Sequence, residues 1–265
     1  MAASARTERR EQMSNRDGEH LKKFEAWLSY LVVSITSFLC FLYFRLLNRT
    51  RVVGRKNIPR RSQNILLVSN HRSLHDSWII GVAGYFPEIL FYPSQTPYNL
   101  AAKENFFKSW IAGFILKLCR TVPVERKKFN RGFLLSVISL LKKGNVCIFY
   151  QATRSFDIAE AKGGVSFIIN NSDPRPIVLP IYLENTEKLF GGGPGQKPKL
   201  SSYLPRFPWF GRKITVSFGK PINFADILKD ENHPNSHERI SQIIVEKIGS
   251  LASDLHPNKS NPIPV

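Results

Sequence analysis

The chain has 265 residues, which is enough for one α/β domain with appendages or for two small domains. Its 38 Lys and Arg residues outnumber its 20 Asp and Glu residues, and the net charge of +18 favours a polyanionic partner, either nucleic acid or an anionic membrane surface. The three cysteines are scattered and form no C-x-x-C pair, which argues against a disulfide framework and favours a reducing environment.

The N-terminal part of the chain joins a polar segment to an apolar one. Residues 1–23 are polar and of mixed charge, and we predict that they are mobile. Residues 24–48 are predicted to form a membrane-anchoring helix, because the eighteen residues from Trp27 to Phe44 include no charged side chain and carry aromatic side chains near both ends. This length is at the lower limit for a spanning helix, so a hairpin in one leaflet and a helix in a protein core stay open as alternatives.

The segment that follows the apolar stretch is strongly basic. Seven Lys and Arg residues and no acidic residue lie between Arg45 and Arg61. Such a flank is typical of the cytoplasmic side of a membrane helix, so we expect the following domain on the cytoplasmic face, against anionic headgroups. The chain has no zinc-finger spacing and no RNA-binding aromatic motif. We therefore predict a phospholipid membrane, and no nucleic acid, as the partner.

Beyond residue 61, candidate strands alternate with candidate helices. The predicted strands are Asn64–Ser69, Tyr98–Lys103, Arg120–Glu125, Val146–Tyr150, Ile177–Leu183 and Ile214–Phe218. The predicted helices are His75–Tyr85, Asn105–Leu118, Arg131–Lys143, Lys162–Asn171 and Ser236–Leu255. This alternation predicts an α/β domain over residues 49–255, with a mixed, largely parallel sheet flanked by helices. Residues 256–265 are predicted to be a disordered tail.

One long segment rich in Gly and Pro, Gly191 to Lys213, is predicted to be a loop. It carries four aromatic residues among basic ones, namely Tyr203, Phe207, Trp209 and Phe210. Two interpretations stay open: the loop rests on a membrane surface, or it packs over the edge of the core.

The segment "SNHRSLHDSW", which directly follows the first of the predicted strands, concentrates titratable side chains. Ser73 and Asp76 have the spacing of a helix N-terminal capping box. His71, His75 and Asp76 include metal-ligand types, but no further ligand motif accompanies them, so we predict no metal site. In a third interpretation, Asp76 accepts a hydrogen bond from His71, fixes its tautomer and makes it a general base at the end of a strand. The chain has no G-x-S-x-G nucleophile elbow, so the nucleophile would be a hydroxyl of the substrate.

The arrangement of Asn70, His71 and Asp76 resembles the first motif, N-H-x-x-x-x-D, of the glycerolipid acyltransferases, the lysophosphatidic acid acyltransferase group. Further blocks of that family resemble this chain in the usual order over about residues 50–225. The matches are Lys103, Glu104, Gly113 and Arg126 in the second block, "FYQATRS" (149–155) for the family's F-P-E-G-T-R-S in the third, Pro180 in a fourth, and "ITVSFGKPI" near the end.

The resemblance implies that His71 is the general base on a lysophospholipid hydroxyl and that Asp76 orients it. The acceptor would be lysophosphatidic acid, the donor acyl-CoA or acyl-carrier protein as co-substrate, and no bound cofactor is implied. Arg154 would match the family's phosphate-binding arginine, because a guanidinium can bond two phosphate oxygens at once. The other implied substrate-binding residues are Gln151, Thr153, Ser155, Lys103 and Arg126.

The third block departs from the family pattern. Gln151 stands for Glu, keeps hydrogen-bonding capacity and cannot be a base, and Ala152 stands for Gly, which is harmless only if φ is negative there. We expect Gln151→Glu to leave activity equal or higher. The changed third block leaves open a catalytically weakened or inactive lipid-binding protein on the same scaffold. The resemblance to the family leaves open a second alternative, a tafazzin-like phospholipid transacylase.

Overall fold

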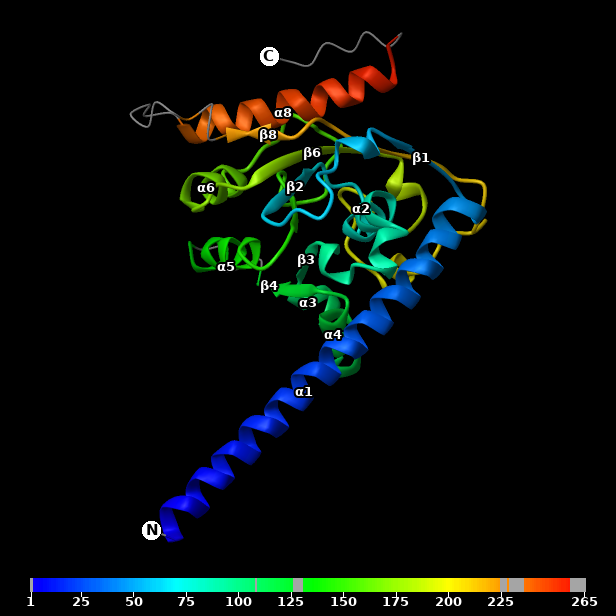
Figure 1. Ribbon diagram of the computed structural model, residues 1–265. Helices are drawn as coiled ribbons and strands as arrows, with labels where there is room; N and C mark the ends of the chain where they lie inside the picture. Colours follow the sequence, from blue (N-terminus) through cyan, green and yellow to red (C-terminus); the bar gives the residue numbers. More distant parts are fainter. Residues whose placement is uncertain (1, 108, 126–130, 225–227, 229–235, 258–265) are drawn as a thin grey trace.

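The computed structural model describes residues 2–107, 109–125, 131–224, 228 and 236–257. Its centre is an eight-stranded sheet with the order β1-β7-β6-β2-β5-β3-β4, and β8 pairs with β6 (Figure 1). The strands are β1 (Arg49–Val53), β2 (Ile65–Ser69), β3 (Tyr98–Ala102), β4 (Thr121–Val124), β5 (Val146–Phe149), β6 (Ile177–Glu184), β7 (Lys213–Phe218) and β8 (Ile222–Asn223). Strands β2 to β6 run parallel, whereas β7 and β8 each pair antiparallel with β6. The predicted mixed, largely parallel sheet is thus confirmed.

Helices cover both faces of the sheet. They are α1 (Ala2–Phe41), α2 (Asp76–Tyr85), α3 (Lys103–Phe106), α4 (Trp110–Leu118), α5 (Arg131–Leu141), α6 (Gly164–Asn171) and α8 (Ser236–Leu255). Leu66 and Val68 of β2 pack with α5, α6 and α8 on one face, whereas Ile65 and Leu67 pack with α1 and α2 on the other. All five residues of β2 are buried, because this strand has a parallel neighbour on each side and helices above and below.

Several element boundaries differ from the sequence-based expectations. The predicted helix Asn105–Leu118 is two helices, α3 and α4. Two short strands, β1 and β8, were not expected. β1 is an edge strand whose exposed arginines Arg49 and Arg51 alternate with Thr50 and Val52, so the segment lacks the apolar run by which buried strands are recognised.

The N-terminal helix is long: its C-terminal part packs along the folded domain, and its N-terminal part extends away from the domain (Figure 1). α1 continues into a short π-helix, Leu42–Leu47, and Gly18–Leu47 is the one helical stretch of the described residues that is long and apolar enough to cross a membrane. The division of the chain at residues 23, 48 and 255 stays a prediction, and most of the predicted C-terminal tail, 258–265, lies outside the described residues.

Candidate active site

The segment 70–76 leaves the C-terminal end of β2 and enters α2. Asn70 anchors it to the neighbouring strand: its side-chain amide donates to the Leu183 carbonyl (2.9 Å), and its side-chain oxygen accepts from the Leu183 N–H (2.7 Å). Both Asn70 and the strand before it are buried. The turn therefore holds a fixed position at the edge of the sheet where α/β proteins bind their ligands.

His71 and Asp76 form a hydrogen-bonded pair. The Nδ1 atom of His71 lies 2.9 Å from Oδ2 of Asp76, and the two side chains are 8% and 0% exposed. A carboxylate can only accept, so Nδ1 carries the proton and Nε2 is the basic nitrogen of the ring. The geometry supports the predicted orientation of His71 by Asp76, and the catalytic role itself stays a prediction.

Asp76 is held by a dense set of donors. Oδ2 also accepts from the backbone N–H groups of Arg72 (2.6 Å) and Ser73 (2.7 Å), and Oδ1 accepts from the hydroxyls of Ser73 and Thr186, both at 2.7 Å. Burial by itself raises the pKa of this carboxyl, but the hydrogen bonds and charge of its partners outweigh that effect and hold the pKa below its ordinary value. Asp76 therefore stays ionised, and it caps the turn and orients His71 at the same time.

His75 lies outside this pair. Its ring stacks on Phe190 with centroids 3.9 Å apart, and burial lowers its pKa to about 4, against a smaller opposite effect of Asp76. It is therefore neutral at pH 7. Among the described residues, no three His, Cys, Asp or Glu side chains come close enough to hold a metal ion.

Gln151 supports His71 from the end of the neighbouring strand, β5. Its side chain is fully buried, accepts from the His71 backbone N–H (2.6 Å) and donates to the Asp157 carbonyl. Its two side-chain groups therefore join the turn after β2 to the loop that follows β5. Ala152, directly after it, has a φ of +59°, the conformation that glycine adopts at least cost.

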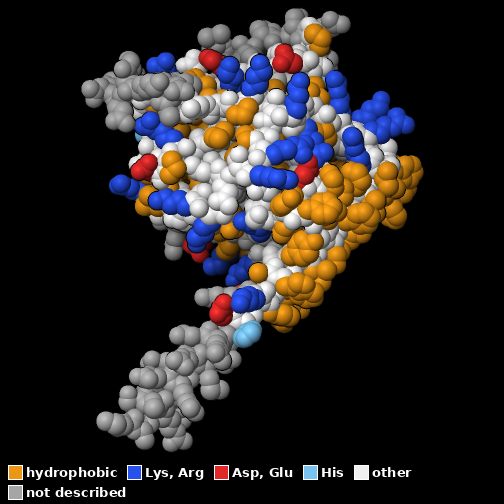
Figure 2. Space-filling view, in the orientation of Figure 1, with side chains coloured by type: hydrophobic (Ala, Val, Ile, Leu, Met, Phe, Trp, Pro, Cys, Tyr) orange, Lys and Arg blue, Asp and Glu red, His pale blue; other side chains and the backbone are white. Residues whose placement is uncertain are grey.

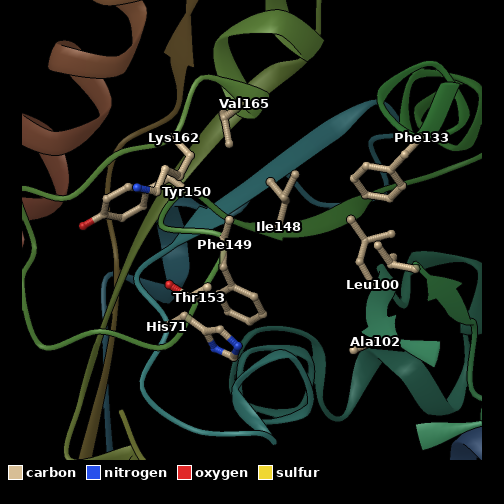
Figure 3. A pocket seen from close by; sticks show the side chains of 13 residues that line it. His71, Leu100, Ala102, Phe133, Ile148, Phe149, Tyr150, Thr153, Lys162 and Val165 are labelled. Carbon is tan, nitrogen blue, oxygen red and sulfur yellow. The ribbon is translucent and has the colours of Figure 1, made fainter. Parts of the chain in front are cut away.

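A mostly apolar cavity of about 220 Å³ opens beside His71. Figure 3 shows the ring of Phe149 lying parallel to that of His71, while Ile148 of the same strand, Leu100 of β3 and Phe133 of α5 face the same space. The two rings are 3.9 Å apart with 9° between their planes. The base therefore stands at one end of an apolar chamber.

The other predicted site residues of the third block differ in their relation to this chamber. Thr153 lines it, and the Ser155 backbone N–H donates to the His71 carbonyl (2.9 Å). The Arg154 guanidinium bonds backbone carbonyls of the Gly-rich loop, those of Gly192 and of Gln196 (2.9 Å to the latter). In this state Arg154 holds the loop beside the site.

The second-block residues are less close. Lys103 is 58% exposed, pairs with Glu125 at 3.1 Å and does not line the cavity, although its neighbour Ala102 does. Arg126 lies outside the described residues. The resemblance to the family placed both in the site, and the structure brings Lys103 only to its edge.

Sequence analysis missed two residues of the site. Thr186 reaches Asp76 from a segment 110 residues further along the chain, and Lys162 lines the cavity. No local signal could have identified Thr186, since only the pairing of β2 with β6 brings it near. Lys162 follows the third block closely and could have been found by its position.

Comparisons with known proteins identify the family of the chain. The family described as Acyltransferase matches residues 49–184, about half of the chain. The 1-acyl-sn-glycerol-3-phosphate acyltransferase of Streptococcus pneumoniae is 23% identical over 206 residues, which cover 76% of this chain and 68% of that protein. The chain belongs to the glycerolipid acyltransferase family.

Two further comparisons concern a second curated relative and a solved structure. Tafazzin of Drosophila melanogaster is 26% identical over 248 residues, which cover 88% of this chain but only 62% of tafazzin. The crystal structure of the LPA acyltransferase PlsC from Thermotoga maritima matches with a TM-score of 0.53 and 20% identity, covering 90% of this chain and 84% of that one. At this identity the likeness to PlsC concerns the fold alone.

Proposed function

We propose that this acyltransferase moves a fatty acyl group from acyl-CoA or acyl-carrier protein to a lysophospholipid hydroxyl, with lysophosphatidic acid as acceptor and phosphatidic acid as product. The observation that carries the proposal is the buried His71–Asp76 pair at the end of an apolar cavity. The S. pneumoniae relative, whose name states this acceptor, supports the choice.

In the proposed reaction, His71 is the general base. Its Nε2 takes the proton from the acceptor hydroxyl while the oxygen attacks the thioester carbonyl. The carbon–sulfur bond then breaks, and the departing thiolate takes the proton back from His71. Asp76 stabilises the imidazolium that exists between these steps, and its lowered pKa keeps it ionised to do so.

The apolar cavity is proposed to hold the acyl chain next to the thioester. Leu100, Phe133, Ile148 and Val165 line it, and they offer no polar group that a hydrocarbon would leave without a partner. Each methylene buried there contributes about 0.8 kcal/mol. Acyl chains that fill the cavity should therefore be preferred over shorter ones.

Cationic and polar groups near the cavity are proposed to hold phosphate. Lys162 and Thr153 line it directly, and Arg154 stands beside it. We keep Arg154, Gln151, Thr153, Ser155, Lys103 and Arg126 as proposed substrate-site residues, with Gln151 and Ser155 acting through the backbone of His71. Arg154 would have to exchange loop carbonyls for phosphate oxygens, and a bidentate fork suits that exchange.

The similarity to tafazzin over 88% of the chain supports a second candidate, in which a phospholipid replaces acyl-CoA as acyl donor. The same base and cavity serve both reactions, because either donor presents an acyl carbonyl to the attacking hydroxyl. A requirement for acyl-CoA or acyl-carrier protein separates the two candidates. The third alternative, a catalytically inactive lipid-binding protein, predicts no turnover with any of these donors.

The acyltransferase is associated with a membrane, as its apolar helix and its lipid-acyltransferase relatives indicate. We propose that the domain lies on the cytoplasmic face, because the segment after the apolar stretch is basic. Protease digestion of sealed right-side-out and inverted membranes tests this orientation. Cleavage of the domain only in the membranes whose cytoplasmic face is turned outward supports the proposed orientation.

The test of the activity is acyl transfer by the full-length protein in detergent and in vesicles. A panel of radiolabelled acyl-CoA, acyl-carrier protein and phospholipid donors is combined with a panel of lysophospholipid acceptors. Turnover that depends on a thioester donor and is lost in His71→Ala supports the proposal. Turnover from phospholipid donors alone selects the transacylase, and lipid binding without turnover in any combination selects the inactive scaffold.

A further inference from the structure

We propose that the segment 204–212, here called the aromatic loop, is a second membrane-inserting element that enters the same leaflet of an anionic bilayer as the outward face of α1. The inference rests on membrane association and not on acyl transfer. Four apolar side chains of the loop point into solvent, with Phe207 83% exposed and Leu204, Trp209 and Phe210 each more than 60% exposed. Contiguous exposed apolar surface of this kind marks an interaction site.

The aromatic loop is anchored to the end of the apolar helix. The Gly211 N–H donates to the Leu47 carbonyl (2.8 Å), the Asn48 side-chain amide donates to the Trp209 carbonyl (3.2 Å), and the Arg212 N–H donates to the Asn48 side-chain oxygen (3.0 Å). Asn48 is fully buried in this junction. Two segments about 160 residues apart therefore form one rigid tip, in which Leu46 and Leu47 are also exposed.

The apolar helix has two apolar faces with different roles. Its inward face packs on the domain through Val33 and Phe44, both buried, and the Ser29 hydroxyl donates to the Leu118 carbonyl (2.6 Å). Its outward face is a stripe at helical spacing that nothing in the described residues covers, comprising Phe24, Trp27, Leu31, Ile35 and Phe38. Figure 2 shows this stripe as a continuous apolar band along the helix.

This packing determines how the helix can meet a bilayer. From Ser29 to Phe44 the helix lies alongside the folded domain, so lipid can reach only its outward face. A helix inserted in this way enters one leaflet from the side, and the exposed tip at its end enters with it. The aromatic loop then sits where Trp side chains are enriched, at the boundary between hydrocarbon and headgroups.

Charge complementarity selects an anionic bilayer as the occupant. The segment 196–223, which includes the aromatic loop, contains Lys and Arg but no Asp or Glu, and the segment 45–61 has the same bias. Exposed cations flank the tip, among them Arg45, Arg49, Arg206 and Lys213, and Arg49 is the cross-strand neighbour of Lys213. Basic side chains near an anionic surface attract it and lose that attraction in salt.

The direct test uses the fluorescence of Trp209 to report whether the aromatic loop inserts into lipid. In the full-length chain, Trp27, Trp78 and Trp110 are replaced by Phe, which leaves one tryptophan of four. The protein is mixed with phosphatidylcholine vesicles that contain phosphatidylserine and brominated acyl chains. We expect a blue shift and strong quenching of Trp209 by bromine, with quenching reduced when phosphatidylserine is omitted or salt is raised.

A second variant, made in the wild-type background, keeps the test independent of the folding of the triple replacement. Phe207→Ser with Phe210→Ser should weaken vesicle affinity at least ~tenfold, since each removes one large apolar contact with lipid. The matched control is Leu135→Ser with Ile177→Ser, two exposed apolar residues away from α1, and it should leave affinity unchanged. Neither pair touches His71, so activity on detergent-dispersed substrate should persist in both.

Three results would overturn the proposal. In the first, bromine does not quench the fluorescence of Trp209, although it quenches that of Trp27 in a variant that keeps Trp27 as its single tryptophan. The second is equal vesicle affinity for the loop variant and the wild type. The third is a dimer in detergent that the loop variant dissociates without change in vesicle binding, since that would make a second copy of the chain the occupant. If the wild-type protein binds vesicles through the aromatic loop but transfers no acyl group, the result contradicts the proposed function and not this inference.

Discussion

The turns that follow β2 and β5 lie side by side and show opposite relations to the family pattern. The first keeps all three motif residues: Asn70 bonds the backbone of β6, and His71 and Asp76 bond each other. The second replaces Glu and Gly of the motif by Gln151 and Ala152, yet it still supports the His71 backbone. The difference teaches that the second turn tolerates a change of charge because its contribution is to position the first turn.

Removal of the base should have the largest effect. His71→Ala should lower kcat by about 10²–10⁴, because the hydroxyl then loses its proton acceptor. The measurement is single-turnover acyl transfer, accompanied by a lipid-binding assay. Intact binding with lost turnover is expected, whereas unchanged turnover would move the chemistry away from the first turn altogether.

Asp76→Asn should have the second largest effect. We expect a loss of kcat of similar order and, in addition, a changed dependence of folding stability on pH. The folded-state pKa of Asp76 is lowered, so the carboxylate contributes stability above its unfolded pKa that is lost as pH falls through the folded value. Wild-type stability should therefore fall in the acid range, and the variant should fall less steeply. Parallel curves for the two proteins between pH 5 and roughly 2 would contradict the assignment.

Gln151→Glu tests the second turn, and here the structure reverses the sequence-based expectation of equal or higher activity. A carboxylate can still accept from the His71 N–H, but it cannot donate to the Asp157 carbonyl, and it would be a buried charge. We expect a loss of about 1–3 kcal/mol of stability at pH 7, with lower activity.

Acid should partly rescue Gln151→Glu. Burial raises the pKa of a carboxyl, and a protonated Glu can donate to the carbonyl, so the stability deficit should be smallest below about pH 4.3 and grow as pH rises through the raised folded-state pKa. Thermal unfolding between pH 4 and 8 measures the trend. An activity above that of the wild type would restore the original expectation and make the family's charge useful in this chain.

Thr186→Val should have a smaller effect, because Ser73 continues to donate to the same oxygen of Asp76. We expect kcat to fall by a few-fold and the loss of stability in acid to begin at a higher pH, since Asp76 loses a donor that lowers its pKa. Thr186→Ser keeps the hydroxyl and should restore both. A fall in kcat in Thr186→Ser as large as in Thr186→Val would indicate a packing role instead.

The fold was predictable from sequence where periodicity is strong. The buried run of β2 and the alternation of strands with helices were sufficient to place the central sheet. The short strands β1 and β8 were missed because their side chains alternate between exposed and buried positions over very few residues, whereas the edge strand β4 was predicted. The break between α3 and α4 was missed because it is only three residues long, from residue 107 to 109, and includes no Gly or Pro.

The site was predictable only as far as its local part. His71 and Asp76 are five residues apart, so spacing alone could place their side chains together. Gln151 and Thr186 are joined to them by the pairing of β2 with β5 and β6, which no local pattern encodes. The partners of Arg154 likewise come from a loop about 40 residues away.

Ala152→Gly tests a further feature of the second turn, the left-handed backbone conformation of a residue that is not glycine. Ala152 has a φ of +59° and an exposed side chain, so the methyl group adds strain without burying surface. Its replacement removes about 1–2 kcal/mol of left-handed strain and adds about 0.4–1 kcal/mol of unfolded-state entropy. The net gain should lie between about zero and roughly 1.6 kcal/mol, and each 1 kcal/mol corresponds to roughly 2–4 °C in Tm. Activity should not change, because the contact of Gln151 with His71 is kept. A loss of stability would show that the turn has relaxed around alanine, and a gain in activity would show that the strain had displaced Gln151.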